Sequence, residues 1–357
     1  MKEKILAINP GSTSTKIAVF AGDENIFTSN LSHSVDELSG LTGFEGQYEY
    51  RKKVILDELN KAGIDISDLQ AIVGRGGLLR PIPSGVYAVT DAMKEDLKKG
   101  WEESKHAANL AALIADEMVR TIPGARAFIA DPPVVDEMED VAKLTGHPKF
   151  RRKSIFHALN QKAIARKHAD AVGTPYEEMN LIVAHLGGGV SVGAHKKGLI
   201  VDVNNALDGD GPFSPERSGG LPVGDMVKLC FSGEMSRDEI KRMIVGKGGI
   251  TAYLGTNDAR EVEKMISEGD AQAELVYNAM IYQVAKDIGA MCTVLSGDVD
   301  AVLITGGIAH SQLVIERLKA RVEKLAQVYV YPGEDEMSAL AMNGLMVLRG
   351  KAVVQDY

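Results

Sequence analysis

The sequence is poor in the features that define several large protein classes. It has only two cysteines, Cys230 and Cys292, in 357 residues, without the spacing of a disulfide framework, a zinc site or a redox pair. We expect both to be reduced core residues. No apolar run approaches the ~18 to 20 residues that cross a bilayer, and the apolar stretch 5–8 ends at Asn9-Pro10, unlike a signal peptide. These absences predict a cytoplasmic protein with no membrane partner.

The chain also lacks an excess of positive charge. Its 40 Lys and Arg residues against 49 Asp and Glu residues give a net charge of -9. Because nucleic-acid binding requires a basic surface, we expect no nucleic-acid partner. A nucleotide needs only a local basic and amide-rich pocket and is not excluded. The length suffices for two domains, each with its own core.

Three familiar ligand-binding motifs are missing. The sequence has no G-x-x-x-x-G-K-[ST], so a P-loop is excluded. No G-x-G-x-x-G follows the first expected strand, so a Rossmann dinucleotide site is unsupported. Asp208-Gly-Asp-Gly resembles the start of a calcium loop, but Phe213 stands where the loop needs glycine, and no Glu closes it.

What is present is a repeated strand pattern. Residues 4–8, 16–20 and about 25–28 form three expected strands, and residues 181–184, 191–194 and 199–203 form three more. Asn9 and His185 follow the first strand of each set, an offset of 185 − 9 = 176 residues, about half the chain. Such self-similarity indicates a duplicated α/β domain, although two unrelated hairpins would give the same pattern.

Helical and extended segments alternate after each set of strands. Amphipathic periodicity predicts helices over 51–61, 106–119, 271–295, 312–325 and 336–348, and apolar runs predict strands over 71–73, 127–130, 299–304 and 328–330. Alternation of this kind is typical of sheets that carry helices on their faces.

Three glycine-containing turns could bind phosphate. Asn9–Lys16 and His185–Ser191 join strands, and Thr305–Ala309 lies between a strand and a helix. Backbone N–H groups and hydroxyls in such turns form anion sites, and a helix N-terminus can face a ligand. Each turn alone is a weak signal, but together they favour nucleotide binding.

At this point the residues resemble a known family. ILAINPGSTSTK (5–16), HLGGGVS (185–191) and LITGGIAHS (303–311) look like the phosphate-1, phosphate-2 and adenosine segments of the acetate kinase branch of the acetate and sugar kinase/Hsp70/actin superfamily. SIFHALNQKAIAR (154–166), VDVNNALDGDGPFSPERSG (201–219), YLGTNDAR (253–260) and YPGEDEMSALA (331–341) are similar to butyrate kinases and branched-chain fatty acid kinases.

The sequence departs from acetate kinases in two of these segments. Their Gly-Thr-Ser-His after Phe-His is Ala-Leu-Asn-Gln after Phe156-His157 here, and their Asp-Phe-Arg is Asp258-Ala259-Arg260. These departures favour the butyrate kinase group.

The resemblance implies two duplicated ribonuclease-H-like α/β domains with an interdomain cleft, where nucleotide and substrate meet. We expect residues 1–165 plus 335–357 to form the domain of the carboxylate and phosphate-1 sites, and residues 166–334 to form the nucleotide-binding domain. The implied reaction is reversible phosphoryl transfer between ATP and butanoate, giving butanoyl phosphate and ADP. The resemblance also implies Mg²⁺ as a cofactor and a homo-oligomeric assembly.

By the same resemblance, Arg217 binds the transferring phosphoryl group and Arg75 binds the substrate carboxylate. Arg80 is a weaker alternative for the second role. His157 steadies the phosphoryl oxygens, although from the sequence alone a core histidine bonded to a backbone carbonyl is the preferred interpretation. Asn9 completes the catalytic set.

Nucleotide binding is expected at Ser12, Ser14, Lys16, His185, Gly187, Gly188, Gly189, Asp258, Arg260, Gly306 and Gly307. Lys16 is also consistent with an outward-facing strand residue, and Asp258 with a helix cap. Asp131 and Glu336 are the expected magnesium ligands, with Asp136 and Glu334 as near neighbours of each.

Two alternatives stay open. An isobutyrate, propionate or acetate kinase would carry the same motifs, because one CH₂ contributes only ~0.8 kcal/mol of burial. A non-transferring ATP-binding module of the same superfamily is an alternative of another class, but it has no reason to carry both Arg75 and Arg217.

Overall fold

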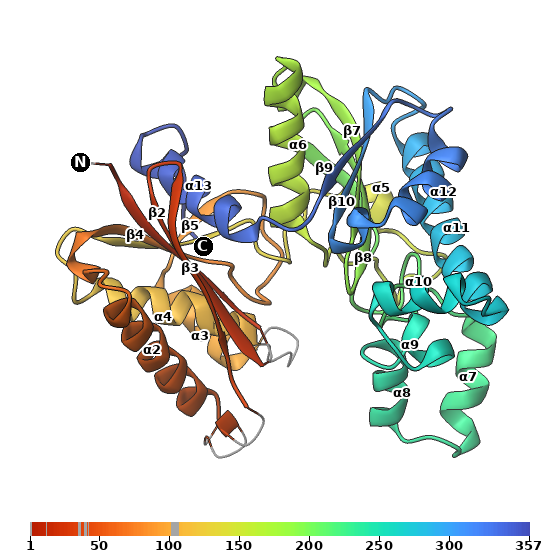
Figure 1. Ribbon diagram of the computed structural model, residues 1–357, viewed down its shortest axis with the longest axis horizontal. Coiled ribbons are helices and arrows are strands. Elements are labelled where there is room, and N and C mark those ends of the chain that lie inside the picture. The colour runs from red at the N-terminus through yellow and green to blue at the C-terminus, as the bar shows by residue number, and fades with distance from the viewer. Residues whose placement is uncertain (1, 12, 35–36, 39–40, 42, 101–106) are drawn as a thin grey trace. The chain divides into compact units, whose positions relative to one another are not determined.

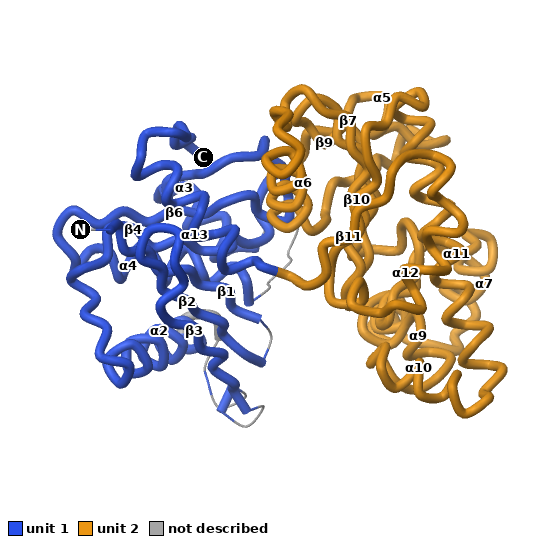
Figure 2. The backbone as a smooth tube through the Cα atoms, turned by 45° about the horizontal axis from the view of Figure 1, so that its top comes forward, with its two compact units in different colours: residues 1–135, 335–357 blue, residues 136–334 orange. Residues whose placement is uncertain are grey.

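The computed structural model describes residues 2–11, 13–34, 37–38, 41, 43–100 and 107–357. The chain forms two compact units, residues 1–135 with 335–357, and residues 136–334 (Figure 2). The expected boundary at 165/166 therefore differs from the observed one at 135/136. It would cut helix α6 (Ala158–Val172), which lies wholly in the second unit.

The first unit is built on a seven-stranded sheet in the order β12-β5-β6-β4-β1-β2-β3 (Figure 1). Its strands are β1 (Lys4–Pro10), β2 (Ser14–Ala21), β3 (Glu24–Ser32), β4 (Leu69–Gly74), β5 (Val86–Ala88), β6 (Arg126–Ala130) and β12 (Val354–Gln355). Its helices are α2 (Gly43–Lys61), α3 (Asp91–Lys99), α4 (Leu110–Val119) and α13 (Glu336–Leu348), with short 3-10 turns at Ile66–Asp68 and Ala107–Asn109.

Burial on both faces explains the apolar runs of the central strands. β1 and β4 pair in parallel, and β4 pairs with β6 in parallel. Helices α2 and α4 pack on one face through Ile55, Leu59 and Ile114. Helix α13 crosses β1 and β4, where a side chain on Gly344 would meet Val73 at 2.7 Å. The C-terminal helix thus returns to the first unit.

The second unit contains a five-stranded sheet in the order β11-β10-β7-β8-β9. Its strands are β7 (Asn180–Leu186), β8 (Val190–Lys196), β9 (Leu199–Val203), β10 (Ala301–Gly306) and β11 (Val328–Pro332). Besides α6, its helices are α5 (Asp140–Lys143), α7 (Val223–Ser232), α8 (Arg237–Ile244), α9 (Gly249–Leu254), α10 (Ala259–Ser267), α11 (Ala271–Val294) and α12 (Gln312–Val322), with 3-10 turns at Tyr176–Glu178 and Gly307–His310.

The two units repeat one plan, as the sequence pattern predicted. β1 and β2 form an antiparallel hairpin in which Asn9 pairs with Lys16. β7 and β8 form the same hairpin, in which His185 pairs with Ser191. Each hairpin continues into a third antiparallel strand. This mixed α/β architecture has two ribonuclease-H-like domains.

Cysteine placement corrects one sequence expectation. Cys292 is partly buried and packs against the core of the second unit, but Cys230 is exposed on α7. The error has a physical source, because α7 is an apolar helix whose residues are all at least partly exposed. Within the described residues, no helix is long and apolar enough to span a membrane.

Candidate active site

In the first unit, the predicted residues gather at one edge of the sheet. Asn9 lies near the end of β1, Arg75 directly follows β4, and Asp131 directly follows β6. Since these neighbouring strands are parallel, their carboxyl ends lie at the same edge, about 4.8 Å apart from strand to strand. Ligands of open α/β sheets bind at such edges.

Glu336 connects two of these strand ends. It opens α13, and its carboxylate lies 3.2 Å from the Arg75 guanidinium. The Asn9 amide donates a hydrogen bond to the other carboxylate oxygen. The side chain of Glu336 is 12% exposed and that of Arg75 is 25% exposed. The structure therefore brings Asn9, Arg75 and Glu336 together.

Asp131 has a different environment from Glu336. It is fully buried, and its carboxylate accepts hydrogen bonds from the Ser84 hydroxyl at 2.6 Å and the Gly85 N–H at 2.9 Å. Its φ of 39° lies in the left-handed region, which Asp tolerates better than most residues. These bonds tie β6 to the start of β5. Among the described residues, no group of three or more His, Cys, Asp or Glu side chains forms a metal cluster.

The first phosphate turn is only partly described, because Ser12 lies outside the described residues. Lys16 is exposed on β2, as its alternative interpretation allowed. Ser14 uses its carbonyl to accept hydrogen bonds from the Gly11 N–H and from Arg51, both at 2.8 Å. Arg51 is fully buried on α2 and also donates to Thr15 Oγ1 at 2.8 Å. A buried cation thus lies behind this turn.

In the second unit, the equivalent edge carries His185 and Glu334. His185 lies near the end of β7, and Glu334 follows β11 by two residues. His185 is 1% exposed, and its Nε2 lies 3.0 Å from a Glu334 carboxylate oxygen. Both ring nitrogens are buried, and neither has a hydrogen-bond partner among the described residues. Glu334, rather than Glu336, is therefore the acidic neighbour of His185.

His157 stacks on His185. The two ring centroids are 4.0 Å apart, with 22° between the planes. His157 directly precedes α6 without a side-chain capping bond, and its Nδ1 lies 2.8 Å from Ser191 Oγ on β8. Two histidines predicted from separate motifs thus share one location.

Arg217 lies against the second phosphate turn. A side chain on Gly189 would place its Cβ 2.0 Å from Arg217 Nη1, so only glycine leaves room for the guanidinium there. Arg217 Nη1 also donates to the Ala206 carbonyl at 2.6 Å. The Ser214 hydroxyl joins the same turn by donating to the Gly188 carbonyl at 2.6 Å. The guanidinium of Arg217 is thereby held beside the glycines of the turn.

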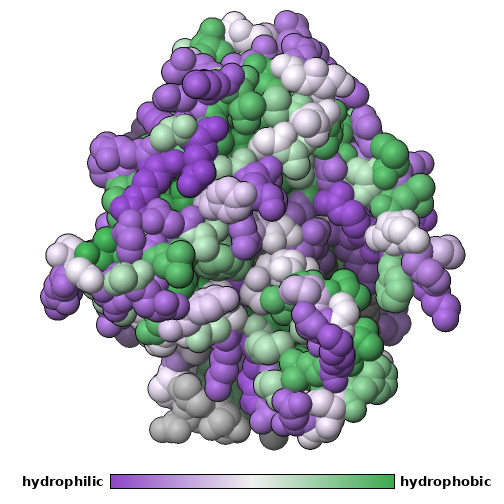
Figure 3. Space-filling view, turned by 90° about the vertical axis from the view of Figure 1, so that its right-hand side faces the viewer, coloured by the Kyte–Doolittle hydropathy of each residue, from purple (hydrophilic) through white to green (hydrophobic). Residues whose placement is uncertain are grey.

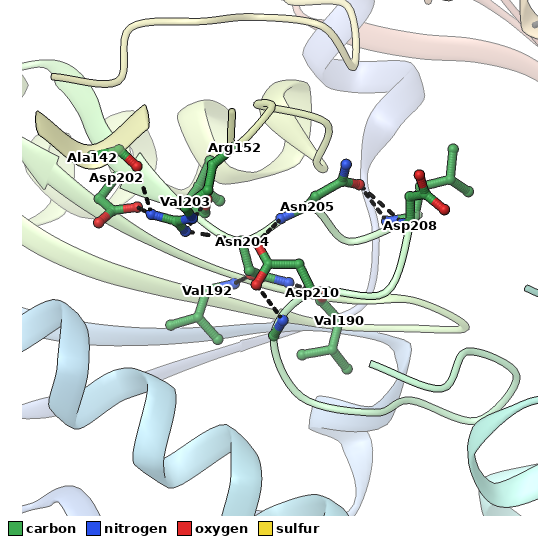
Figure 4. A network of polar contacts seen from close by, with 12 residues as sticks. Ala142, Arg152, Val190, Val192, Asp202, Val203, Asn204, Asn205, Asp208 and Asp210 are labelled. Atoms are coloured by element: carbon green, nitrogen blue, oxygen red, sulfur yellow. Dashed lines mark hydrogen bonds and ion pairs between the residues drawn. The ribbon is translucent and has the colours of Figure 1, made fainter. Parts of the chain in front are cut away.

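The segment leading to Arg217 is held by a polar network around Arg152 (Figure 4). Arg152 donates to Asp202 at 2.8 Å and to the Val203 carbonyl at 3.0 Å. Burial raises the pKa of Asp202, although Arg152 opposes the shift. Asn205 accepts the backbone N–H groups of residues 207 and 208, and Asp210 accepts the Asn205 N–H at 3.0 Å. Side chains of the 201–219 motif, together with Arg152, therefore hold the segment before Arg217 by hydrogen bonds.

Gly306 and Gly307 end β10 and begin the following 3-10 turn. Gly306 has a φ of 95°, and a Cβ there would meet the Leu186 carbonyl oxygen at 2.3 Å, so glycine is required for the close approach of β10 to β7. Gly307 is exposed, and a Cβ there would meet nothing within 4 Å. A ligand can therefore approach its backbone.

Asp258 and Arg260 are not gathered with the other residues by any contact of the described chain. Asp258 caps α10 by accepting the Arg260 N–H at 2.9 Å. The Arg260 guanidinium, 91% exposed, also makes two bonds to its carboxylate, at 3.0 and 2.6 Å. These hydrogen bonds lower the pKa of Asp258 to about 2. The cap anticipated for Asp258 is present.

Comparison with known proteins identifies the chain. The model of the acetokinase family matches residues 142–342. A protein of Bacteroides thetaiotaomicron named "Probable butyrate kinase" is 53% identical over 354 residues, which cover 99% of each chain. The chain belongs to the acetokinase family.

Solved structures share the fold of this acetokinase family member. Acetate kinase from Porphyromonas gingivalis has a TM-score of 0.81 at 20% identity, over 97% of this chain and 100% of that chain. A propionate kinase from Francisella tularensis has a TM-score of 0.75 at 19% identity, over 96% and 98%. These similarities establish the fold of the family and not its substrate.

Four residues around the site were missed by the sequence analysis. Gln161 and Ser191 surround His157, Arg51 lies behind the first phosphate turn, and Ser214 bonds to the second. Gln161 and Ser191 do fall within motifs typical of the family. Nothing in the sequence marks Arg51, because only the fold shows that it is buried.

Proposed function

We propose that this acetokinase family member transfers a phosphoryl group reversibly between ATP and a short-chain carboxylate, and that butanoate is the preferred acid. The observation that carries the proposal is the group of His157, His185 and Arg217 around the Gly187–Gly189 turn. Imidazole, guanidinium and backbone amide groups are the donors that stabilise a transferring phosphoryl group. The name of the 53% identical relative favours butanoate.

The two units take different reactants in this proposal. In the first unit, Arg75 binds the carboxylate, and Asn9 with Ser12, Ser14 and Lys16 supports a phosphate. The second unit binds the nucleotide, ATP or ADP, through His185 and the Gly187–Gly189 turn at its phosphates, and through Gly306 and Gly307 near its adenosine. Asp258 and Arg260 are also assigned to the adenosine end. Their assignment has the least support, because the two side chains already bond to each other.

The chemistry needs little beyond positioning and positive charge. A carboxylate oxygen attacks the γ-phosphorus of ATP, a new O–P bond forms, and the bond to the leaving oxygen of ADP breaks. A carboxylate is ionised at pH 7, so no general base is required. Arg217 and His157 stabilise the charge on the equatorial oxygens, and Arg75 orients the attacking carboxylate.

Mg²⁺ fits the acidic residues by the nature of their donor atoms. The ion prefers oxygen ligands, keeps several waters and needs only one or two carboxylates. Glu336, at the start of α13, and Asp131, directly after β6, supply such oxygens in the first unit. These two carboxylates would hold the ion, and the bound ion would supply positive charge that neutralises phosphate oxygens.

The deciding experiment is acyl-phosphate formation from ATP and Mg²⁺, trapped as the hydroxamate, with acetate, propionate, butanoate, isobutanoate and valerate. The highest kcat/KM is expected with butanoate. Best turnover with isobutanoate, propionate or acetate would retain the mechanism and overturn the specificity. Absence of hydroxamate with every acid, despite ATP binding, would favour the non-transferring ATP-binding module.

We also propose that the protein is cytoplasmic and forms a homo-oligomer. Support for the oligomer comes from α7, where Val223, Val227 and Phe231 are 76%, 53% and 87% exposed. Beside α7 lies an apolar cavity of about 630 Å³, lined by residues such as Met226, Leu229, Met243, Ala252 and Leu275. It contains none of the predicted site residues. Hydrophobic patches interrupt the polar surface on the face seen in Figure 3, and large exposed patches mark interaction sites.

A further inference from the structure

A buried chain of hydrogen-bonded side chains runs from His157 into the interior of the second unit. Its members, in order, are His157, Ser191, Gln161, His195 and Tyr176. The four residues beyond His157 are each at most 4% exposed. The successive side-chain distances are 2.8, 2.9, 3.0 and 2.8 Å. Each step is therefore a hydrogen bond of ordinary length.

The orientation of the Gln161 side-chain amide determines which group donates and which accepts in each hydrogen bond of this series. Its Nε2 lies 3.2 Å from the Ser191 backbone carbonyl and 2.9 Å from Ser191 Oγ. A backbone carbonyl only accepts hydrogen bonds, so the amide nitrogen must face Ser191. The amide oxygen then faces His195 and accepts from its Nε2 at 3.0 Å.

His195 is consistent with this direction. Burial, reinforced by the charges of Lys162 and Arg166, holds its pKa well below the ordinary value. The neutral ring has one hydrogen, which lies on Nε2, so Nδ1 accepts from the Tyr176 hydroxyl at 2.8 Å.

The Ser191 hydroxyl connects Gln161 to His157 by accepting one hydrogen bond and donating another. Its oxygen accepts from Gln161, and in the described part of the chain the acceptor for its own hydrogen is His157 Nδ1. If His157 carried a hydrogen on Nδ1, the fully buried Ser191 hydroxyl would lose this acceptor, and an unsatisfied buried donor is costly. Asn204 fixes the strand around Ser191, because it bonds to the Val190 carbonyl and the Val192 N–H (Figure 4).

We propose that this chain holds His157 neutral with its hydrogen on Nε2, and that Gln161 and Ser191 are positioning residues for phosphoryl transfer. His157 then acts through Nε2 as a hydrogen-bond donor, the role that stabilising a phosphoryl oxygen requires. The tautomer follows from the contacts above, whereas the kinetic consequence rests on the proposed function.

The tautomer is tested directly by NMR of the full-length protein with ¹⁵N-labelled histidine, with His157 assigned by comparison with His157→Gln. An unprotonated Nδ1 and a protonated Nε2 at pH 7.5 are expected. In Gln161→Glu, the carboxylate offers no N–H to Ser191 and becomes the acceptor for its hydrogen, so the hydrogen of His157 should move to Nδ1. A protonated Nδ1 in the unsubstituted protein, or an unchanged spectrum in Gln161→Glu, would overturn the proposal.

The kinetic arm uses the hydroxamate assay on the same variants. Gln161→Glu should lower kcat by about tenfold or more while KM for ATP changes less than twofold. His168→Gln is the matched control, because His168 is a buried histidine of α6 that bonds to the Tyr331 hydroxyl at 2.9 Å. A similar loss of kcat in both variants, or a change confined to KM, would remove the positioning role. If no acid gives a product, the proposed function fails, and the NMR result still decides the tautomer.

Discussion

The Arg75 guanidinium lies 3.2 Å from the Glu336 carboxylate, although the two residues come from opposite ends of the chain. The C-terminal helix α13 supplies the acid and the loop after β4 supplies the base. One carboxylate occupies only part of a guanidinium, which carries five N–H donors in a planar fork. Arg75 is thus fixed in place by Glu336 and keeps the capacity to bind a second carboxylate.

This arrangement predicts the effect of Arg75→Ala. KM for butanoate should rise roughly 10- to 100-fold, since a hydrogen-bonded charge pair contributes about 1.5–3 kcal/mol, while KM for ATP stays within threefold. Initial rates over a range of butanoate concentrations measure both constants. Arg80→Ala is the control, because Arg80 stacks on Tyr357 at 4.1 Å instead. An unchanged KM for butanoate in Arg75→Ala would exclude Arg75 from the carboxylate site.

A second prediction concerns the contact of Gly189 with Arg217. Arg217→Ala should lower kcat by on the order of 10³, as expected for an arginine that stabilises a transferring phosphoryl group. Gly189→Ala should also lower kcat, because its Cβ would displace the guanidinium. The displaced group is the end of a flexible side chain, so the folded structure should persist.

A double-mutant cycle separates this mechanism from general damage to the turn. If Gly189→Ala acts through Arg217, it should lower kcat much less in the Arg217→Ala background than in the unsubstituted protein. Circular dichroism checks that each variant is folded. Fully additive losses, or a loss below tenfold in Arg217→Ala itself, would contradict the role of Arg217.

The sequence predicted the fold class because the strand pattern is local and repeated. Strands β1 and β7 are apolar runs that end in turn residues, so the sequence alone locates both hairpins. The boundary at 135/136 could not be found in this way, because no change in composition marks it. The mistake about Cys230 has a similar origin, since an apolar helix is ordinarily buried and α7 is not.

The identity of the site residues was predictable where a motif resembles the family. Their contacts with one another were less predictable, because these depend on the tertiary structure. Both His157 and His185 were expected, but their stacking depends on how α6 packs against β7. The acidic residues show the limit most clearly. Glu336 and Glu334 are two positions apart, and only the structure shows that one bonds to Arg75 and the other contacts His185.

The exposed face of α7 predicts a change of assembly in Phe231→Glu. Phe231 is 87% exposed, so a charge there should not disturb the core, but it would be costly to bury in an interface. We expect light scattering to give a smaller particle mass for Phe231→Glu than for the unsubstituted protein. The variant should nevertheless melt no lower than the unsubstituted protein does when that protein is dissociated. Val353→Glu, at an equally apolar residue that is 85% exposed in the first unit, should leave the mass unchanged. Equal masses for all three proteins would exclude α7 from the interface.

The last prediction concerns the pH dependence of stability. Burial, and then the nearby Asp210 carboxylate, raise the pKa of Asp287 to about 6, while Lys286 and Arg152 oppose the shift. The folded protein therefore binds this proton more strongly than the unfolded chain, and the ionised carboxylate destabilises the fold. The destabilisation is complete above pH 6 and disappears as the pH falls toward 3.8, the ordinary value.

Asp287→Asn should accordingly raise the free energy of unfolding at pH 7.5 by on the order of 1 kcal/mol. The gain should shrink through pH 6 and vanish near pH 4, where the natural side chain is itself neutral. Urea denaturation of both proteins at pH 7.5, 6 and 4.5 measures the difference. Asp225→Asn supplies the control, because Asp225 is exposed on α7 and pairs only with Lys228 among the described residues. A gain of equal size at all three pH values would show that Asp287 acts through packing and not through its charge.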